Sequence, residues 1–201
     1  MIGNKKIGIV ILAAGASSRL GFPKQLVKFK GKVLLQNIID LADSFDFKTK
    51  ILVLGANEKE IREQIDIKEF DTVSNENWQE GMGSSIRSGL ERALKLQPEL
   101  EHLMILLSDQ PLVTREQIQQ LVNVQIKNNV QAAFSEYEGE TGVPAIFSKE
   151  LFPQLLKLDG DQGAKKLIFI SDLKYETVRF EGGKFDVDTQ ADVELLKDLE
   201  K

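Results

Sequence analysis

The fold is indicated most clearly by one stretch near the N-terminus, Ile7-Gly-Ile-Val-Ile-Leu-Ala-Ala-Gly-Ala-Ser-Ser-Arg-Leu-Gly-Phe-Pro-Lys24. It opens with a continuous apolar run, which is typical of a strand covered on both faces in a parallel sheet. Two more runs of this kind are Ile51–Leu54 and Leu103–Leu107. Small or polar residues follow each run. Because ligands bind beyond the carboxyl ends of parallel strands, these polar ends are expected to gather around a ligand.

Segments with helical spacing separate the strands. Apolar residues lie on one helical face within 34–42, 86–94 and 118–126. Thr114 with Gln117, and Thr189 with Asp192, predict capping boxes. Gly182-Gly183 predicts a late hairpin that joins 177–180 to 184–187. The alternation of strand and helix predicts an α/β fold of Rossmann-like three-layer α/β/α type with a mainly parallel twisted sheet, formed by a single domain over residues 1–201.

Composition excludes several functional classes. The chain has 201 residues, a net charge of −5, no cysteine and one histidine. Disulfide frameworks, zinc–cysteine sites, iron–sulfur clusters and thiol nucleophiles are therefore excluded. His102 is expected at the start of its strand, away from the ligand, which argues against a hydrolase triad. The net charge argues against nucleic-acid binding. No apolar run reaches the roughly 20 residues of a spanning helix, so we expect a cytoplasmic protein without a membrane partner.

Positive charge is concentrated near the N-terminus. Residues 1–39 contain seven Lys and Arg residues and no Asp or Glu, an asymmetry that often marks an anion site. Arg19 and Lys24 fall in the loop after the first strand, where Gly15 would let backbone N–H groups cradle phosphate oxygens. The loop matches neither the Walker A pattern nor the dinucleotide fingerprint. We therefore expect a phosphate-binding loop of another kind.

Three further stretches carry candidate functional residues. Gly81 and Gly83 precede a predicted helix, whose free N–H donors, with the Ser84 and Ser85 hydroxyls, could point at an anion or base. Taken alone, the stretch rather favours a capped helix start with Trp78 anchored in the core. Asp109 closes a buried strand, where a carboxylate suits Mg²⁺ but could equally cap the next helix. Asp186 and Asp188 flank Val187 in an extended segment, so only one of the two is expected to face the ligand. The list of candidate residues is Gly81, Gly83, Ser84, Ser85, Asp109, Asp186 and Asp188.

Together these stretches resemble the molybdenum cofactor cytidylyltransferases, a MobA-like family of nucleotidyltransferases, and more broadly the related guanylyltransferases. The longest matching element is Leu12-Ala-Ala-Gly-x-Ser-x-Arg-Leu-Gly-x-Pro-Lys-Gln-Leu26. The others follow in the family's order: Asn77-Trp-x-x-Gly-Met-Gly-Ser-Ser-Ile86, Asp109-Gln-Pro111, Gly142-x-Pro-x-x-Phe147, Gly160-Asp-x-Gly-Ala164 and Asp186-Val-Asp-Thr189. The resemblance implies a fold of the nucleotide-diphospho-sugar transferase type.

The resemblance also implies roles for single residues. Lys24, Arg19 and Asp109 would be catalytic, and Asp109 and Asp188 would hold Mg²⁺, with Mn²⁺ as a substitute. The nucleotide would be bound by Leu12, Ala13, Ala14, Gly15, Ser17, Ser18, Arg19, Lys24, Asn77, Gly81, Gly83, Ser84, Ser85 and Asp109. The acceptor would be bound by Gln110, Gly142, Pro144 and Gly163.

The implied reaction is transfer of CMP from CTP to the phosphate of molybdopterin with release of pyrophosphate. In this family Ala-Ala-Gly after the first strand goes with cytosine and Ala-Gly-Gly with guanine, so Ala13-Ala14-Gly15 implies CTP rather than GTP. The acceptor phosphate is already an anion, so alignment and electrostatics suffice without a general base. Val143 departs from the family, where a histidine often follows the glycine of this motif.

Other functions stay open at this point. One alternative is a guanylyltransferase, or another cytidylyltransferase that acts on a sugar or polyol phosphate. A second is a non-catalytic protein that delivers molybdenum cofactor to an apo-molybdoenzyme, such as one of the xanthine dehydrogenase type. A third is a plain dinucleotide-binding domain, which the failed glycine fingerprint disfavours.

Overall fold

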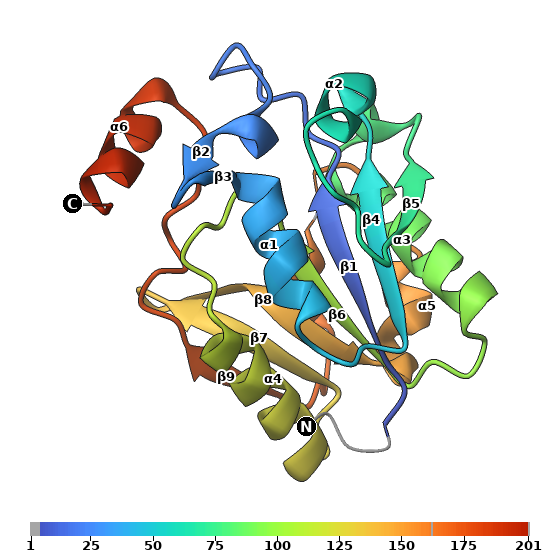
Figure 1. Cartoon of the computed structure of the whole chain (residues 1–201). Coiled ribbons are helices and arrows are strands. Elements are labelled where there is room, and N and C mark those ends of the chain that lie inside the picture. The colour runs from blue at the N-terminus through green and yellow to red at the C-terminus, as the bar shows by residue number, and fades with distance from the viewer. Residues whose placement is uncertain (1–4, 162, 201) are drawn as a thin grey trace.

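The computed structural model describes residues 5–161 and 163–200 and shows one large twisted sheet (Figure 1). Its seven strands lie in the order β5-β4-β1-β6-β8-β7-β9. All neighbours in it are parallel except the two pairs that include β8. The strands are β1 (Ile7–Ala13), β4 (Thr49–Leu54), β5 (Asp71–Ser74), β6 (His102–Leu107), β7 (Ala132–Tyr137), β8 (Glu140–Ser148) and β9 (Tyr175–Arg179), beside a separate pair, β2 (Lys28–Phe29) and β3 (Lys32–Val33). The predicted mainly parallel sheet is confirmed.

Helices cover both faces of this sheet. One face carries α1 (Leu34–Asp43), α2 (Glu58–Arg62) and α4 (Arg115–Lys127), and the other carries α3 (Met82–Leu96) and α5 (Phe152–Leu155). The last helix, α6 (Gln190–Asp198), packs near β2 and β3 at one end of the molecule (Figure 1). Short 3₁₀ turns are η1 (Lys24–Leu26), η2 (Trp78–Glu80), η3 (Lys149–Leu151) and η4 (Ala164–Phe169). The predicted three-layer α/β/α arrangement is confirmed.

The central strand β1 explains why its sequence is continuously apolar. All seven of its residues are buried. Ile9 and Ile11 face the core under α1 and α4, whereas Val10 and Leu12 face the core under α3. Since successive strand residues point to opposite faces, both faces need apolar side chains. Burying one such side chain contributes roughly 1.5–3 kcal/mol.

The predicted hairpin near the C-terminus is wrong. The segment 184–187 forms no strand, and β9 instead pairs in parallel with β7. The Val187 N–H donates to the carbonyl of Asp109 over 3.1 Å, and the Val187 side chain is fully buried in the cluster under α6. Burial of Val187 therefore places the segment 184–187 beside the end of β6, and not alongside β9.

One of the two predicted capping boxes is complete. At α6, Thr189 accepts from the Asp192 N–H while the Asp192 carboxylate accepts from Thr189. At α4, Thr114 accepts from the Gln117 N–H over 3.2 Å, but the Gln117 side chain donates to Ser135 instead. The second half of that box is wrong because Gln117 is buried and bonds to the sheet.

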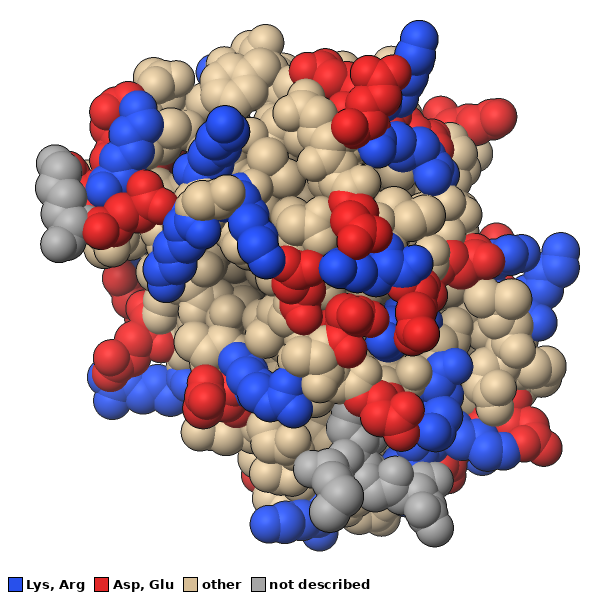
Figure 2. Space-filling model, viewed as in Figure 1, with Lys and Arg blue, Asp and Glu red and all other residues tan. Residues whose placement is uncertain are grey.

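Charged side chains of both signs are interspersed over the face seen in Figure 2. Basic side chains gather at its upper left, over β2 and β3, where Lys28, Lys30 and Lys32 are exposed. No helix within residues 5–161 and 163–200 is long and apolar enough to cross a membrane.

Candidate active site

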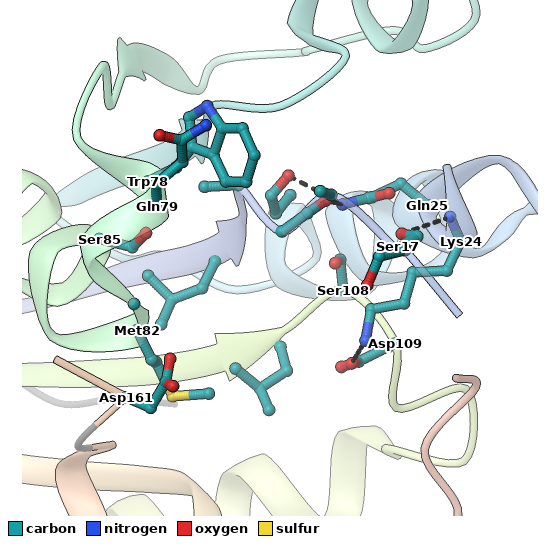
Figure 3. Close-up of a pocket in the computed structure, with 18 residues that line it drawn as sticks. Ser17, Lys24, Gln25, Trp78, Gln79, Met82, Ser85, Ser108, Asp109 and Asp161 are labelled. Atoms are coloured by element: carbon teal, nitrogen blue, oxygen red, sulfur yellow. Dashed lines mark hydrogen bonds and ion pairs between the residues drawn. The ribbon is translucent and has the colours of Figure 1, made fainter. Parts of the chain in front are cut away.

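A cavity of about 390 Å³ lies where β1 and β6 end. Figure 3 shows Lys24 reaching Asp109 at one end of it, with Trp78 and Gln79 at another and Met82 beside Asp161. The lining residues are Leu12, Ala13, Ala14, Gly15, Ala16, Ser17, Ser18, Lys24, Gln25, Trp78, Gln79, Gly81, Met82, Ser85, Leu107, Ser108, Asp109 and Asp161. The polar ends of two predicted strands therefore meet at one cavity.

The loop after β1 is held in shape by its own side chains. Ser17 has φ 55°, and its hydroxyl accepts from the Lys24 N–H over 3.0 Å. The Gln25 side chain is 1 % exposed, and its amide donates to the carbonyls of Ala13 (3.0 Å) and Gly15 (3.2 Å). Gln25 is not among the predicted site residues, although a polar residue next to Lys24 at the end of the motif could have indicated it. These bonds fix the loop before any ligand arrives.

Lys24 lies between two carboxylates that are far apart in the sequence. Its ammonium contacts Asp109 Oδ2 and lies 2.7 Å from Asp188 Oδ1. Arg19 donates to Asp188 Oδ2 over 2.7 Å from the outer side, with its own side chain 69 % exposed. The Lys24 and Asp109 side chains are only 16 % and 12 % exposed. The structure thus brings the predicted catalytic and metal residues into one charged cluster.

The charges of this cluster reinforce one another. Burial lowers the pKa of Lys24, but the charges and hydrogen bonds of Asp109 and Asp188 outweigh it, so the pKa is raised. Burial likewise opposes ionisation of Asp188, yet Lys24 and Arg19 lower its pKa. Burial and the charge of Asp109 raise the pKa of the neighbouring Asp186 to about 7. Lys24 is accordingly a fixed positive charge at neutral pH.

The donor set fits a divalent cation with oxygen ligands. Asp109 Oδ1 is buried and has no hydrogen-bond partner. Such an orphaned carboxylate oxygen is what a hard cation would satisfy. Within residues 5–161 and 163–200 no group of three His, Cys, Asp or Glu side chains could hold a metal. Asp109 and Asp188 would thus supply part of the coordination, and substrate phosphates and water the rest.

The glycine–serine stretch does begin a helix, as predicted, but its donors are less free than expected. The Gly83 N–H donates to the Gly160 carbonyl over 3.1 Å, and the Ser84 N–H to the Gly81 carbonyl over 3.2 Å. The Ser84 hydroxyl, 2 % exposed as a residue, donates to backbone carbonyls. Ser85 and Gly81 line the cavity, whereas the lining does not include Asn77, Gly83 or Ser84. Arg19 also lies outside the lining and reaches the cluster through Asp188.

The four predicted acceptor residues lie outside the cavity lining. Gln110 is 1 % exposed, and its amide donates to the Val143 carbonyl over 3.2 Å. Gly142 packs against the Tyr137 hydroxyl, so that a Cβ there would collide with it. Pro144 follows a cis peptide bond, and Gly163 lies against the Met82 sulfur. Gly142 and Pro144 lie on β8, which flanks β6 on the side opposite β1 and its phosphate loop.

Residues 9–177 match the family model of the MobA-like NTP transferase domain. The chain belongs to this family. It is therefore a nucleotidyltransferase of the MobA-like family. The family assignment agrees with the resemblance that the motifs carry.

Curated relatives span a range of activities. The chain is 27% identical over 202 residues to the purine catabolism protein PucB of Bacillus subtilis, covering 94% of each. It is 28% identical to nicotine blue oxidoreductase of Paenarthrobacter nicotinovorans, covering 78% of each. It is 30% identical over 162 residues to the bifunctional protein GlmU of Buchnera aphidicola, but spans only 34% of that protein.

Solved structures share the whole fold. The Rv0371c homologue from Mycobacterium sp. strain JC1 has a TM-score of 0.83 at 29% identity, with 97% of each chain covered. Rv0371c of Mycobacterium tuberculosis in complex with manganese has a TM-score of 0.80 at 28% identity, covering 96% of this chain and 98% of that one. A divalent metal in a relative of this similarity agrees with the oxygen donors described above.

Proposed function

We propose that the chain transfers CMP from CTP to the terminal phosphate of molybdopterin and releases pyrophosphate. The observation that carries the proposal is the partly buried Lys24 between Asp109 and Asp188, beside the glycine–serine loop after β1. The chain has no cysteine, and its one histidine lies at the start of β6, at the end of the strand far from the cavity. Such a site suits transfer between phosphates, which needs charge stabilisation more than proton transfer.

The reaction follows from these groups. An oxygen of the acceptor phosphate attacks the α-phosphorus of CTP, the new P–O bond forms, and the bond to the β-phosphate oxygen breaks as pyrophosphate leaves. The attacking oxygen is already anionic, so no residue has to remove a proton. Lys24 and Arg19 would balance the charge that spreads over the phosphoryl oxygens. Each such donor is worth roughly 10²–10³ in rate.

Asp109 and Asp188 would hold Mg²⁺, or Mn²⁺ in its place. The unpartnered Asp109 Oδ1 supports this assignment. When bound, the cation supplies positive charge that orients and neutralises the triphosphate. Gly15 to Ser18 line the same cavity, and their backbone N–H groups would hold the phosphates.

The choice of base and acceptor rests on the family pattern and on pocket shape. Ala13, Ala14 and Gly15 leave one wall of the cavity without large side chains, and in this family that tripeptide goes with cytosine. By the family pattern the acceptor would be bound near Gln110, Gly142, Pro144 and Gly163, which lie outside the cavity lining. GTP as donor, a sugar or polyol phosphate as acceptor, and delivery of cofactor to an apo-molybdoenzyme are the alternatives that the experiment must separate.

A pyrophosphate-release assay tests the proposal. The protein is incubated with Mg²⁺ and either CTP, GTP or UTP, and with molybdopterin, its molybdenum-loaded form or a sugar phosphate. We expect release with CTP and a molybdopterin form only. Release only with a sugar phosphate would overturn the acceptor, and a preference for GTP would overturn the base. No release in any combination would overturn the proposed reaction and favour a delivery role.

A further inference from the structure

The two carboxylates proposed to hold the cation are already occupied by cationic side chains. Lys24 contacts Asp109 Oδ2 and lies 2.7 Å from Asp188 Oδ1, and Arg19 lies 2.7 Å from Asp188 Oδ2. Of the four oxygens on these two carboxylates, only Asp109 Oδ1 has no partner. A cation therefore cannot bind both carboxylates while Lys24 keeps this position.

We propose that Lys24 closes the cation site of the nucleotide-free protein, so that the divalent ion enters only together with the triphosphate. The inference rests on the proposed function for the identity of the two metal ligands, and it goes beyond it by assigning an order of binding. Lys24 acts here as a positioning residue for the carboxylates.

Electrostatics explains why the triphosphate would open the site. A free dication entering beside Asp109 would meet the like charge of the Lys24 ammonium within a few ångströms, in surroundings only 12–16 % exposed. A triphosphate offers Lys24 and Arg19 anionic oxygens of its own, in the loop that begins at Ser17 and reaches Lys24. The two side chains can then exchange carboxylates for phosphates, which frees three carboxylate oxygens for the ion.

Local geometry permits that exchange. The Lys24 backbone is tied to the Ser17 hydroxyl over 3.0 Å, so the loop stays in place while the long side chain moves. The Arg19 side chain is 69 % exposed and can turn without disturbing the core. Asp188, by contrast, is held by its backbone, whose N–H donates to Asp192 over 3.1 Å. The Asp188 backbone thus stays in place while the Lys24 and Arg19 side chains change partners.

Binding of Mn²⁺ alone tests the inference without an acceptor. The signal of free Mn²⁺ in electron paramagnetic resonance is titrated with wild-type protein, Lys24→Met, Lys24→Gln and Lys24→Arg, each with and without CTP. Protein-free samples with the same CTP concentration serve as the reference, because CTP itself chelates Mn²⁺. Without CTP, we expect both neutral variants to bind Mn²⁺ at least about tenfold more tightly than wild type, because a like charge is gone. Lys24→Arg and the exposed matched control Lys28→Met should bind as weakly as wild type.

The unfolding temperature is a second measurement, which also shows whether the Lys24 variants fold. Mn²⁺ without CTP should raise the unfolding temperature of Lys24→Met and Lys24→Gln but not of wild type, since the ion replaces the missing positive charge. Equal Mn²⁺ affinity of wild type and both neutral variants without CTP would overturn the inference alone. Absence of Mn²⁺ binding to wild type even with CTP would overturn the metal site itself, and with it both proposals.

Discussion

Gly15 and Gly81 both line the cavity, but the structural reason for having glycine differs between the two positions. A Cβ at Gly15 would meet nothing within 4 Å, so a side chain there would project into open cavity. At Gly81 the backbone has φ +98°, and a Cβ would lie 2.5 Å from the Gly160 backbone. The absence of a side chain at Gly15 leaves space for a ligand, whereas glycine at position 81 is required by the local backbone conformation.

Substituting these glycines separates binding from stability. Gly81→Ala should lower the free energy of unfolding by about 1–2 kcal/mol, because a left-handed backbone and a close contact both oppose the methyl group. Gly15→Ala should leave that free energy unchanged and raise the Kd for the nucleoside triphosphate. Urea unfolding and nucleotide titration of both variants check this. A destabilised Gly15→Ala with normal binding would contradict the assignment of the cavity.

The direction in which each side chain points could not be predicted from the residue type alone. Ser84 and Ser85 are adjacent and identical, yet Ser85 lines the cavity while Ser84 bonds to backbone carbonyls. In a helix, neighbours differ in direction by roughly 100°, so the choice between them depends on how the helix is rotated against the sheet. That rotation is a tertiary property.

At the scale of elements, the start of α6 positions a proposed metal ligand. Asp192 Oδ2 accepts from the N–H groups of Asp188 (3.1 Å) and Thr189 (2.7 Å). The capping box was predictable because its residue types and spacing are local. Its link to Asp188 means that a helix cap also orients a carboxylate of the cluster.

Removing this cap should affect both stability and the site. Asp192→Ala should lower the free energy of unfolding by about 1 kcal/mol, because the Asp188 and Thr189 N–H groups lose their acceptor, and should weaken Mn²⁺ binding in the presence of CTP. Glu194→Ala, on the same helix and exposed, is the matched control and should do neither. Thermal unfolding and metal titration measure the two effects. Normal metal binding by Asp192→Ala would show that Asp188 does not depend on the cap.

The first residue of β6 should make the protein sensitive to acid. Burial lowers the pKa of His102 below its ordinary 6.5. The unfolded chain therefore binds a proton between pH 6.5 and the lower folded value, where the native protein does not, so stability falls as the pH drops through this window. His102→Gln should remove this component, at most about 1.4 kcal/mol per pH unit. Urea unfolding at two pH values checks it, and an unchanged slope would contradict it.

At the scale of the whole molecule, the strands that bear local apolar runs were predictable and their neighbours were not. β1, β4 and β6 follow from Ile7, Ile51 and Leu103 onward because burial on both faces needs continuous apolar residues. The parallel pairing of β9 with β7 is non-local, and the two glycines before Lys184 suggested a nearby hairpin instead. The hairpin prediction was wrong because burial of the Val187 side chain determines the path of this segment more strongly than the turn preference of the two glycines.

The charged cluster itself is a product of topology. Asp109 and Asp188 lie 85 and 164 residues from Lys24 in sequence, and both reach it because the chain returns to the carboxyl edge of β1 and β6. The polar residues at the strand ends predicted the location of the cavity, and the family resemblance indicated which residues act together in it. Composition alone, with a net charge of −5, gave no hint of a triphosphate site.

The cluster of Lys24, Asp109 and Asp188 is the proposed place where the triphosphate reacts. Single-turnover pyrophosphate formation from CTP, Mg²⁺ and molybdopterin, measured in wild type, Asp109→Asn and the exposed control Asp172→Asn, tests it most directly. We expect a loss of at least about 10²-fold in Asp109→Asn with folding retained, and no change in the control. An Asp109→Asn protein that forms pyrophosphate at the wild-type rate would contradict it.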